Sequence, residues 1–449
     1  MAKVFYGTII HSVSVSEIEF ISNGLLFVDA QGRVAKLLRN VPQDQLQDGL
    51  AGIDLAVAEL TVLEDNQFII PGFVDTHIHA SQYSYCGNGH DIPLLEWLDS
   101  LTFPHEAKFK DSHYARNIYT RAVARSLRNG TTSACWFATI HLDATKELVR
   151  AIHEQGQRAF VGKVNMNQNA PDILIETTES SIADTRAFVE YVNSFNTQLM
   201  QDQASDQRSK PLVTPIITPR FAISCTSDLL RGLGKLAAEF DIPIQSHLCE
   251  NTNEIEFTMS SFPDSTSYTA VYADHGLLTQ RSIMAHCVHM KDDEWTLMKD
   301  SHAGISHCPS SNFNIKSGMA DVRRMIDMDL KVGLGTDVAG GYSCSILDAI
   351  RCSRICSIAR NPTRSLLIPE LFYMATMGGA RVMELGDTIG NFNVGMEFDA
   401  ILVNIAVKGS PIDVFAHDTV QTKFEKYLFV GDDRNNAKVY IQGKEVKLS

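Results

Sequence analysis

Two histidines, His77 and His79, stand one residue apart at the end of an apolar run, within FVDTHIHASQ at 73–82. A strand alternates its side chains between two faces, so both imidazoles lie on one face and Ile78 on the other. Converging imidazoles are a common part of a metal site, but a catalytic zinc site needs three protein ligands. The pair therefore predicts a metal site only if the rest of the chain supplies further ligands nearby.

Further candidate ligands stand where other apolar runs end. His247, followed three residues later by Glu250, His286 and Asp337 each mark the end of a different run. A lone buried histidine is more often a core residue, but the whole set at the ends of separate runs favours a metal centre, because parallel barrels gather catalytic residues there. Three imidazoles and one carboxylate predict a catalytic zinc ion, with iron as the alternative.

The elements that must position these residues alternate along the middle of the chain. Eight apolar runs lie at 68–77, 131–138, 158–166, 212–218, 242–248, 282–287, 303–308 and 331–337, and helices are predicted at 145–156, 226–241 and 345–361. Continuous apolar strands that alternate with helices are typical of parallel sheets covered on both faces. The pattern predicts an α/β fold, a (β/α)8 TIM-like barrel over residues 70–389, with a doubly wound open sheet as the alternative.

Both ends of the chain are instead rich in residues that favour strands. Strands are predicted at 3–10, 17–22, 25–29, 33–38, 398–405, 426–431 and 439–448, with turns at Asn23-Gly24 and Gln31-Gly32. Together they predict a small β-sandwich-like domain built from residues 1–69 and 390–449. A polar stretch at 199–211 predicts a surface excursion between the third and fourth repeats.

Composition excludes several classes of protein. The 449 residues are 44% hydrophobic and 20% charged, which is ordinary for a globular chain. The net charge of −14 argues against a nucleic-acid partner, which needs a basic surface. Neither a secretory signal nor a membrane-spanning apolar run is visible. Nine scattered cysteines without a spacing pattern indicate reduced thiols and a cytoplasmic location.

Several motifs resemble the amidohydrolase superfamily of metal-dependent barrel hydrolases: PGFVDTHIH at 71–79, QSHLCEN at 245–251, MAHC at 284–287, SHCPSSN at 306–312 and GLGTDVAGG at 333–341. Others are similar to the members that deaminate guanine, among them IPLLEWL at 92–98, NGTTSACWFATIH at 129–141 and TPRFAISC at 218–225. The resemblance covers most of the chain. It implies a zinc-dependent hydrolase that converts guanine to xanthine and ammonia.

The resemblance also implies roles for individual positions. His77, His79, His247 and Asp337 match the zinc ligands, His286 the histidine beside the activated water, and Glu250 the proton-shuttling glutamate. The expected catalytic residues are thus Glu250, His286 and Asp337. The expected substrate contacts are Gln82, Arg220, Phe221, His247 and Glu250. The fourth run ends in ITPRF, without the lysine that binuclear members carry there, so one metal ion per subunit is expected.

Several of these residues also fit purely structural roles. Phe221 is equally typical of a core side chain, Gln82 of a turn-stabilising amide and Glu250 of a solvated loop carboxylate. A related hydrolase acting on another purine, a pyrimidine or a triazine is the second hypothesis, and a scaffold without catalysis is the third. The planar fork of Arg220 favours guanine, because it suits the acceptors O6 and N7. The resemblance implies a homodimer that binds this small molecule and neither nucleic acid nor membrane.

Overall fold

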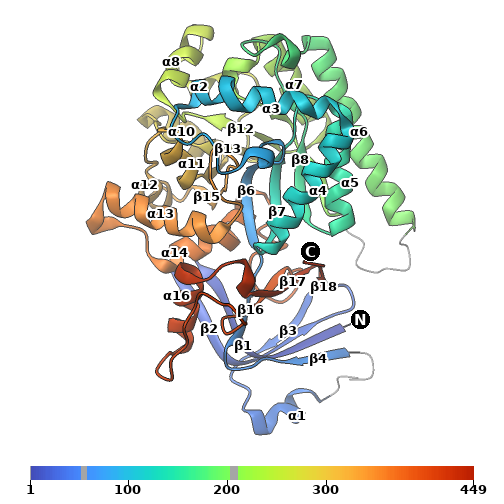
Figure 1. Ribbon diagram of the computed structural model, residues 1–449, viewed down its shortest axis with the longest axis vertical. Coiled ribbons are helices and arrows are strands. Elements are labelled where there is room, and N and C mark those ends of the chain that lie inside the picture. Colours follow the sequence, from blue (N-terminus) through green and yellow to red (C-terminus); the bar gives the residue numbers. More distant parts are fainter. Residues whose placement is uncertain (1, 52–57, 203–210, 449) are drawn as a thin grey trace.

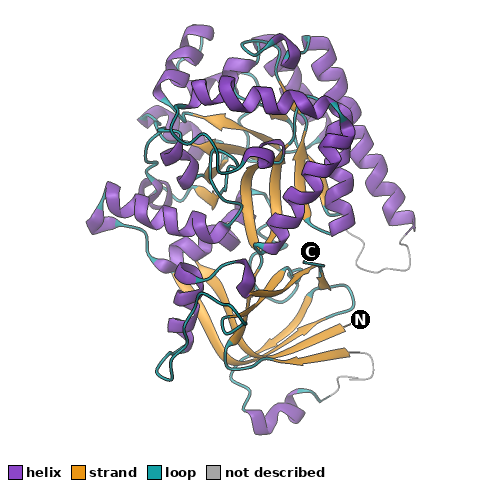
Figure 2. Ribbon diagram, in the orientation of Figure 1, coloured by secondary structure: helices purple, strands orange, loops and turns teal. Residues whose placement is uncertain are grey.

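The computed structural model describes residues 2–51, 58–202 and 211–448. Two parts lie one above the other along its long axis (Figure 1). Parallel strands surrounded by helices form the upper part, and a sheet from both ends of the chain forms most of the lower part (Figure 2). The α/β organisation predicted for the middle of the chain is confirmed.

The middle of the chain supplies two four-stranded parallel sheets. The first has the order β10-β8-β7-β6 and contains β6 (Phe73–His79), β7 (Thr131–Phe137), β8 (Arg158–Gly162) and β10 (Val213–Pro215). The second has the order β12-β13-β14-β15 and contains β12 (Ile244–Leu248), β13 (Ser282–His286), β14 (Gly304–His307) and β15 (Lys331–Leu334). A short parallel pair is formed by β9 (Val164–Asn165) and β11 (Thr218–Pro219). Each of the eight predicted runs contains a strand of one of the four-stranded sheets.

The two parallel sheets approach each other at both edges. Ile217, just after β10, forms an isolated parallel bridge with Ile244 of β12. On the other side, the backbone N–H of Asp337, just after β15, donates to the carbonyl of His77 in β6 over 2.9 Å. All strands run in the same direction, so their carboxyl ends border one common region.

Helices connect and cover these strands. The helices of the described residues are α1 (Leu46–Gly49), α2 (Leu94–Trp97), α3 (Phe103–Glu106), α4 (Ser112–Arg128), α5 (Leu142–Gln155), α6 (Thr178–Asp202), α7 (Ser227–Phe240), α8 (Thr252–Ser261), α9 (Tyr268–Asp274), α10 (Asp292–Asp300), α11 (Pro309–Asn314), α12 (Val322–Asp327), α13 (Ile346–Arg360), α14 (Ile368–Tyr373), α15 (Gly379–Val382) and α16 (Val420–Val430). Of these, α1 lies at the far end of the terminal sheet, away from the parallel strands (Figure 1). The three predicted helices are confirmed as α5, α7 and α13. Among the described residues, no helix combines the length and apolarity that crossing a membrane requires.

The polar stretch predicted as a surface excursion divides at the end of α6. Residues 199–202 continue this helix, and residues 203–210 lie outside the described part of the chain. The prediction is therefore not tested over most of its length.

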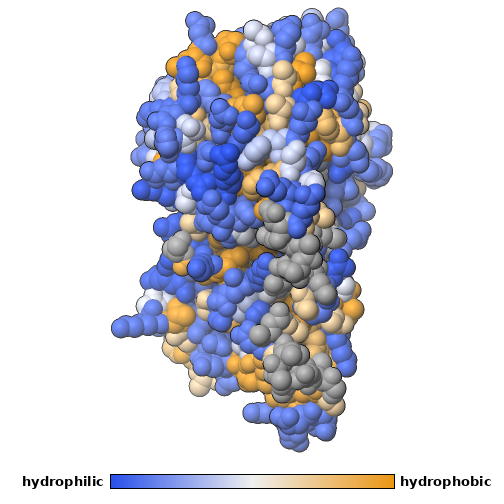
Figure 3. Space-filling model, turned by 90° about the vertical axis from the view of Figure 1, so that its right-hand side faces the viewer, coloured by the Kyte–Doolittle hydropathy of each residue, from blue (hydrophilic) through white to orange (hydrophobic). Residues whose placement is uncertain are grey.

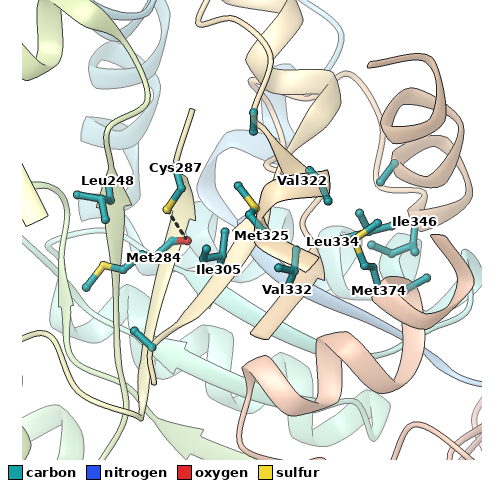
Figure 4. Close-up of a cluster of buried hydrophobic side chains, with 14 of the residues drawn as sticks. Leu248, Met284, Cys287, Ile305, Val322, Met325, Val332, Leu334, Ile346 and Met374 are labelled. Atoms are coloured by element: carbon teal, nitrogen blue, oxygen red, sulfur yellow. Dashed lines mark hydrogen bonds between the residues drawn. The ribbon is translucent and has the colours of Figure 1, made fainter. Parts of the chain in front are cut away.

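Hydrophobic side chains on one face of the second sheet pack against the surrounding helices. Figure 4 shows Ile305 and Val332 from the strands near Met325 of α12, with Leu248 at the other side of the same cluster, and all four are buried. His247 directly precedes Leu248, so its side chain lies on the opposite face of β12. The surface, by contrast, is mainly hydrophilic on the side shown in Figure 3. Apolar packing outside the sheet thus leaves its other face for polar residues.

The two ends of the chain form one eight-stranded sheet. It contains β1 (Ala2–Ser14), β2 (Glu17–Val28), β3 (Val34–Leu38), β4 (Ala58–Val62), β5 (Gln67–Pro71), β16 (Ala400–Asn404), β17 (Asn436–Ile441) and β18 (Lys444–Glu445). Seven strands follow the order β18-β17-β16-β5-β1-β2-β3, and β4 pairs with β1. The first predicted apolar run is thus divided, because β5 belongs to this sheet and β6 to the parallel strands. The terminal sheet extends to Pro71, two residues beyond the limit expected at 69.

Two local predictions in the terminal segments are wrong. Asn23-Gly24 is no turn, because it lies inside β2, where Gly24 is paired with Gly7 beside a register shift. A Cβ atom at Gly24 would lie 2.6 Å from Cδ1 of Ile9, so this glycine permits close packing across the strands. The turn expected at Gln31-Gly32 does lie between β2 and β3.

The second error is the strand predicted at 426–431, most of which lies in α16. The side chain of Thr419 accepts a hydrogen bond from Thr422 N and begins the helix. Phe424, Tyr427 and Leu428 are all fully buried, at the spacing of one helical face. A short apolar run fits either a strand or a helix, and here the cap and the spacing determine the helix.

A buried ion-pair group connects the parallel strands to the terminal sheet. Arg158, at the start of β8, donates from Nε to Asp399 Oδ2 over 3.0 Å and from Nη2 to Glu397 Oε2 over 2.6 Å. All three side chains are at most 6% exposed. Removing one partner of such a group leaves unpaired charge in the interior.

Replacing Arg158 by methionine should therefore lower the free energy of unfolding by about 3–5 kcal/mol, because two carboxylates lose their buried partner. Chemical denaturation measures this change. The control is Arg186→Met, which removes an exposed pair with Glu239 and should change the free energy of unfolding far less. Equal effects of the two substitutions would contradict the prediction.

Candidate active site

Four potential metal ligands meet at the carboxyl ends of β6, β12 and β15. Nε2 of His77 and Nε2 of His79 lie 3.1 and 3.4 Å from Oδ1 of Asp337. Nε2 of His79 lies 3.2 Å from Nε2 of His247. Two ligands of a tetrahedral zinc ion are about 3.3 Å apart when each bond is about 2.0–2.1 Å long. The structure thus brings the four predicted ligands together at separations that fit one ion.

The protonation states of these groups suit a cation. Burial, and then the neighbouring imidazoles, hold the pKa of both His79 and His247 well below the usual range, so the rings are neutral. Burial alone would raise the pKa of Asp337, but the surrounding imidazoles outweigh it and the net shift is downward. The site therefore offers neutral nitrogens and an ionised carboxylate. Nε2 of His77 is buried without a hydrogen-bond partner among the described residues, as expected of a ligand atom.

Hydrogen bonds orient two of the ligands. Nδ1 of His247 lies 2.6 Å from the carbonyl oxygen of Arg220 and donates to it, which leaves Nε2 with its lone pair toward the other ligands. The carboxylate of Asp75 accepts from His77 N over 3.2 Å and from Thr336 N over 3.0 Å. Asp75 thus connects the strand of the His77–His79 pair to the segment that precedes Asp337. Burial raises the pKa of Asp75 to about 7.

Asp75 was missed by the sequence analysis, although a signal was present. It lies two residues before His77 and is the one acidic residue of β6, a strand whose seven residues are all buried. A buried carboxylate in a strand needs specific hydrogen-bond or ion-pair partners.

His286 and Glu250 lie next to the ligand group. Nε2 of His286 is 3.3 Å from Oε2 of Glu250 and 3.8 Å from Oδ2 of Asp337. Nδ1 of His286 faces Oδ1 of Asn312 at 2.8 Å and donates to it, which fixes the ring. Burial, and then the charge of Asp337, raise the pKa of Glu250 well above its usual range. Glu250 can therefore hold and release a proton beside the metal ligands.

The backbone turns sharply where these residues stand. His286 has a φ of +75° and Asp337 a φ of +46°, both in the left-handed region that non-glycine residues rarely adopt. Such conformations persist only where surrounding contacts enforce them, and they gather at functional sites. His286 and Asp337 each stand at the end of an apolar run, and each side chain points into the region that the strand ends border.

One pocket contains the ligand group and the predicted substrate contacts. Its lining comprises His79, Gln82, Leu94, Trp97, Leu98, Arg220, Phe221, His247, Glu250, Ile315 and Asp337. The structure thus brings Gln82, Arg220 and Phe221 beside the metal ligands. The apolar wall of Leu94, Trp97 and Leu98 comes from the segment between β6 and β7. The residue types of this wall gave no functional signal, because they are equally typical of a core.

The polar substrate contacts are themselves held in place. Oε1 of Gln82 accepts from the backbone N–H of Ala339 over 3.0 Å. Nη1 of Arg220 donates to Oε2 of Glu106 over 2.6 Å. The sequence analysis did not single out Glu106, because an isolated acid in a helical segment shows no distinguishing pattern.

His307 is also buried at a strand end, but it is not part of the ligand group. It ends β14, and burial lowers its pKa to about 3. The sequence analysis assigned it no ligand role, and the described metal-ligand group does not contain it.

Known proteins share this fold and sequence along the whole chain. Residues 68–446 match the Amidohydrolase family. The guanine deaminases of Dictyostelium discoideum and Homo sapiens are 44% and 42% identical to this chain over 454 and 456 residues, which cover 99% of it and 98% and 97% of those proteins. A crystal structure of guanine deaminase from C. acetobutylicum, with guanine bound in its active site, superposes with a TM-score of 0.87 at 34% identity and covers 100% of both chains. The chain therefore belongs to the amidohydrolase family, and the three relatives named here are guanine deaminases.

Proposed function

We propose that this protein is a zinc-dependent guanine deaminase, which hydrolyses guanine to xanthine and ammonia and so acts in purine breakdown. One observation carries the proposal: a single pocket is lined by three of the metal ligands, by Glu250, and by Arg220, Phe221 and Gln82. Similarity to guanine deaminases over 99% of the chain supports the choice of substrate.

Recognition of the base rests on complementary hydrogen bonding. The guanidinium of Arg220 has five N–H donors, and the contact with Glu106 leaves donors for O6 and N7 of guanine. Adenine carries an amine at position 6, so it presents a donor where Arg220 requires an acceptor. Phe221 is 6% exposed and lines the pocket, where its ring can stack on a purine. Gln82 offers both a donor and an acceptor to the base edge.

The proposed metal is one zinc ion per chain, held by His77, His79, His247 and Asp337, with iron as the alternative. When bound, zinc supplies a Lewis acid that makes water nucleophilic near neutral pH. Neutral imidazoles and one carboxylate are the donors that such an ion prefers, and their spacing supports the assignment.

The residues around the ligands account for the proton transfers. Asp337 accepts a proton from the attacking water, and His286 orients this water by a hydrogen bond. The oxygen adds to C2, and Glu250 delivers a proton to the adjacent ring nitrogen. The proton of the added hydroxyl then passes through Glu250 to the exocyclic nitrogen, so the C2–N bond breaks and ammonia leaves. The proton held by Asp337 returns Glu250 to its acid form. The sum is guanine plus water giving xanthine plus ammonia.

The proposal includes a finer account of the architecture. We assign the eight strands β6, β7, β8, β10 and β12–β15 to one closed (β/α)8 barrel, spanning about residues 70–389, and the terminal strands to a small β-domain. The Ile217–Ile244 bridge and the Asp337–His77 hydrogen bond support closure, because they join the two parallel sheets at both edges.

The proposed assembly is a homodimer in the cytoplasm. Ile355 and Ile358 on α13 are 62% and 41% exposed, and Tyr342 is 45% exposed beside Cys352 of the same helix. Exposed apolar residues on one helix are typical of a surface that a second subunit covers. The nine free cysteines support a reducing compartment.

Metal analysis tests the ligand assignment. Purified protein should contain about one zinc ion per chain, and His77→Ala protein should contain much less, because the loss of one of four ligands weakens binding of the ion. The matched control is His307→Ala, which removes a buried histidine outside the ligand group. Equal zinc contents in the two variants would contradict the assignment. Elemental mass spectrometry measures the ion directly and distinguishes zinc from iron.

Ultraviolet absorbance of guanine mixed with the zinc-loaded protein tests the activity. We expect conversion to xanthine, with kcat reduced roughly 10²–10⁴-fold in Glu250→Gln protein, because a positioned proton donor is lost. This variant should keep its zinc. A wild-type protein that binds zinc but deaminates only adenine, cytosine or a triazine would disprove guanine as the substrate.

Sedimentation velocity tests the assembly. The wild-type protein should sediment as a dimer of 49.7 kDa chains, and Ile355→Lys should shift it toward the monomer, because a charge would be buried in the interface. Ile173→Lys, at another exposed isoleucine, is the control. A wild-type monomer at micromolar concentration would refute the proposal.

A further inference from the structure

We infer that Glu106 is a positioning residue that holds Arg220 and Gln82 toward the oxygen-bearing edge of the purine and so determines selectivity for a 6-oxo base. The inference rests on the proposed function and names the residue on which its specificity depends. Glu106 does not line the pocket, so it acts through the two residues that do.

Two side chains of the short helix α3 contact the guanidinium of Arg220. Oε2 of Glu106 accepts from Nη1 of Arg220 over 2.6 Å, and the ring of Phe103 lies 5.4 Å from the guanidinium carbon. The two α3 residues are separated by one helical turn, so both face the same way. Glu106 and Arg220 are 1% and 3% exposed. A salt bridge without solvent around it has a defined geometry, and here it fixes the direction of the remaining Arg220 donors.

The other carboxylate oxygen of Glu106 contacts the segment that follows the His77–His79 pair. Oε1 lies 3.4 Å from Oγ of Ser81 and 3.5 Å from Nε2 of Gln82, both at the long end of the hydrogen-bond range. The opposite atom of the Gln82 amide, Oε1, accepts from Ala339 N. These two contacts distinguish the ends of the amide and determine which of them presents a donor. One carboxylate therefore orients both polar substrate contacts.

Charge gives a second reason for an acid at this position. Arg220 lines the same pocket as the ligands His79, His247 and Asp337. A buried guanidinium beside a site for a divalent cation is repelled by it unless an anion compensates the charge. Glu106 supplies that anion, with Oε2 2.6 Å from Nη1 of Arg220. The arginine donors then remain available to neutral acceptors such as O6.

The test compares Glu106→Gln with wild-type protein in kinetics and in binding. The KM for guanine should rise roughly 10–100-fold, because a charge-assisted contact that orients the donors is lost. The kcat should change much less, and zinc content should not change, because Glu250 and the metal ligands are intact. As competitive inhibitors, hypoxanthine, which has O6, should weaken in parallel with guanine. Unsubstituted purine, which lacks O6 but keeps N7, should weaken much less.

A double-mutant cycle shows whether Glu106 acts through Arg220. Arg220→Gln alone should raise KM, and adding Glu106→Gln should raise it much less than it does in the wild-type protein, because only the longer contact with Gln82 is then left to lose. The matched control is Glu239→Gln, which removes the carboxylate of an exposed arginine pair and should leave both constants unchanged. If Glu106→Gln protein does not fold, Glu106→Asp keeps the charge but shortens its reach, and the same rise in KM and the same loss of hypoxanthine binding are expected.

The outcomes separate this inference from the function on which it rests. A wild-type protein that does not turn over guanine refutes the proposed function, whatever Glu106 does. A wild-type protein that does so, with an unchanged KM in the folded Glu106 variant, refutes the inference alone. Additive effects in the cycle, or equal weakening of hypoxanthine and unsubstituted purine, also overturn it.

Discussion

A buried polar group destabilises a protein unless it is paired, and this constraint governs the site. Three imidazoles and one carboxylate lie within 4.8 Å of one another, buried at the ends of three strands. A divalent cation satisfies all four groups at once. The parallel strands bring these ends together, and the helices outside them provide the apolar packing that fixes the strands. Hydrogen bonds donated to the carbonyl of Arg220 and to the carboxylate of Asp75 then orient His247 and His77. The fold is thus organised around a donor set that is complete only with its ion.

Arg220 contacts both a predicted metal ligand and the adjoining pocket. Its backbone carbonyl accepts a hydrogen bond from the predicted ligand His247, and its side chain lines the adjoining pocket and pairs with Glu106. Because one residue serves both purposes, the distance between the predicted metal ligands and the arginine donors is set within a single amino acid. Reactions of this kind depend on holding the attacked carbon within a few tenths of an ångström of the nucleophile's path. Such precision is easier to maintain over one residue than across two independent loops.

Much of this arrangement could be predicted, because it follows from local rules. Strand alternation places His77 and His79 on one face, and parallel strands bring His247, His286 and Asp337 to the same end. The prediction failed where packing between separate segments decides the local structure. Asn23-Gly24 resembles a turn, but Gly24 lies inside a strand and pairs with Gly7 of the neighbouring strand.

The raised pKa of Glu250 and the contacts of Glu106 could not be predicted for the same reason. Both depend on burial and on partners from other elements, which no spacing in the sequence encodes. The metal ligands are recognisable by residue type, whereas the residues that support them have ordinary types in ordinary positions.

The passage from β5 to β6 has a consequence for how such proteins are assembled from parts. One residue, Gly72, separates a strand of the terminal sheet from the strand that bears His77 and His79. A Cβ atom there would lie 2.1 Å from Oγ1 of Thr132, so the junction has no room for a longer or bulkier linker. The terminal sheet is therefore no detachable module. Exchange of catalytic barrels between relatives, in evolution or by recombination in the laboratory, must carry β5 and its sheet partners along with the histidines.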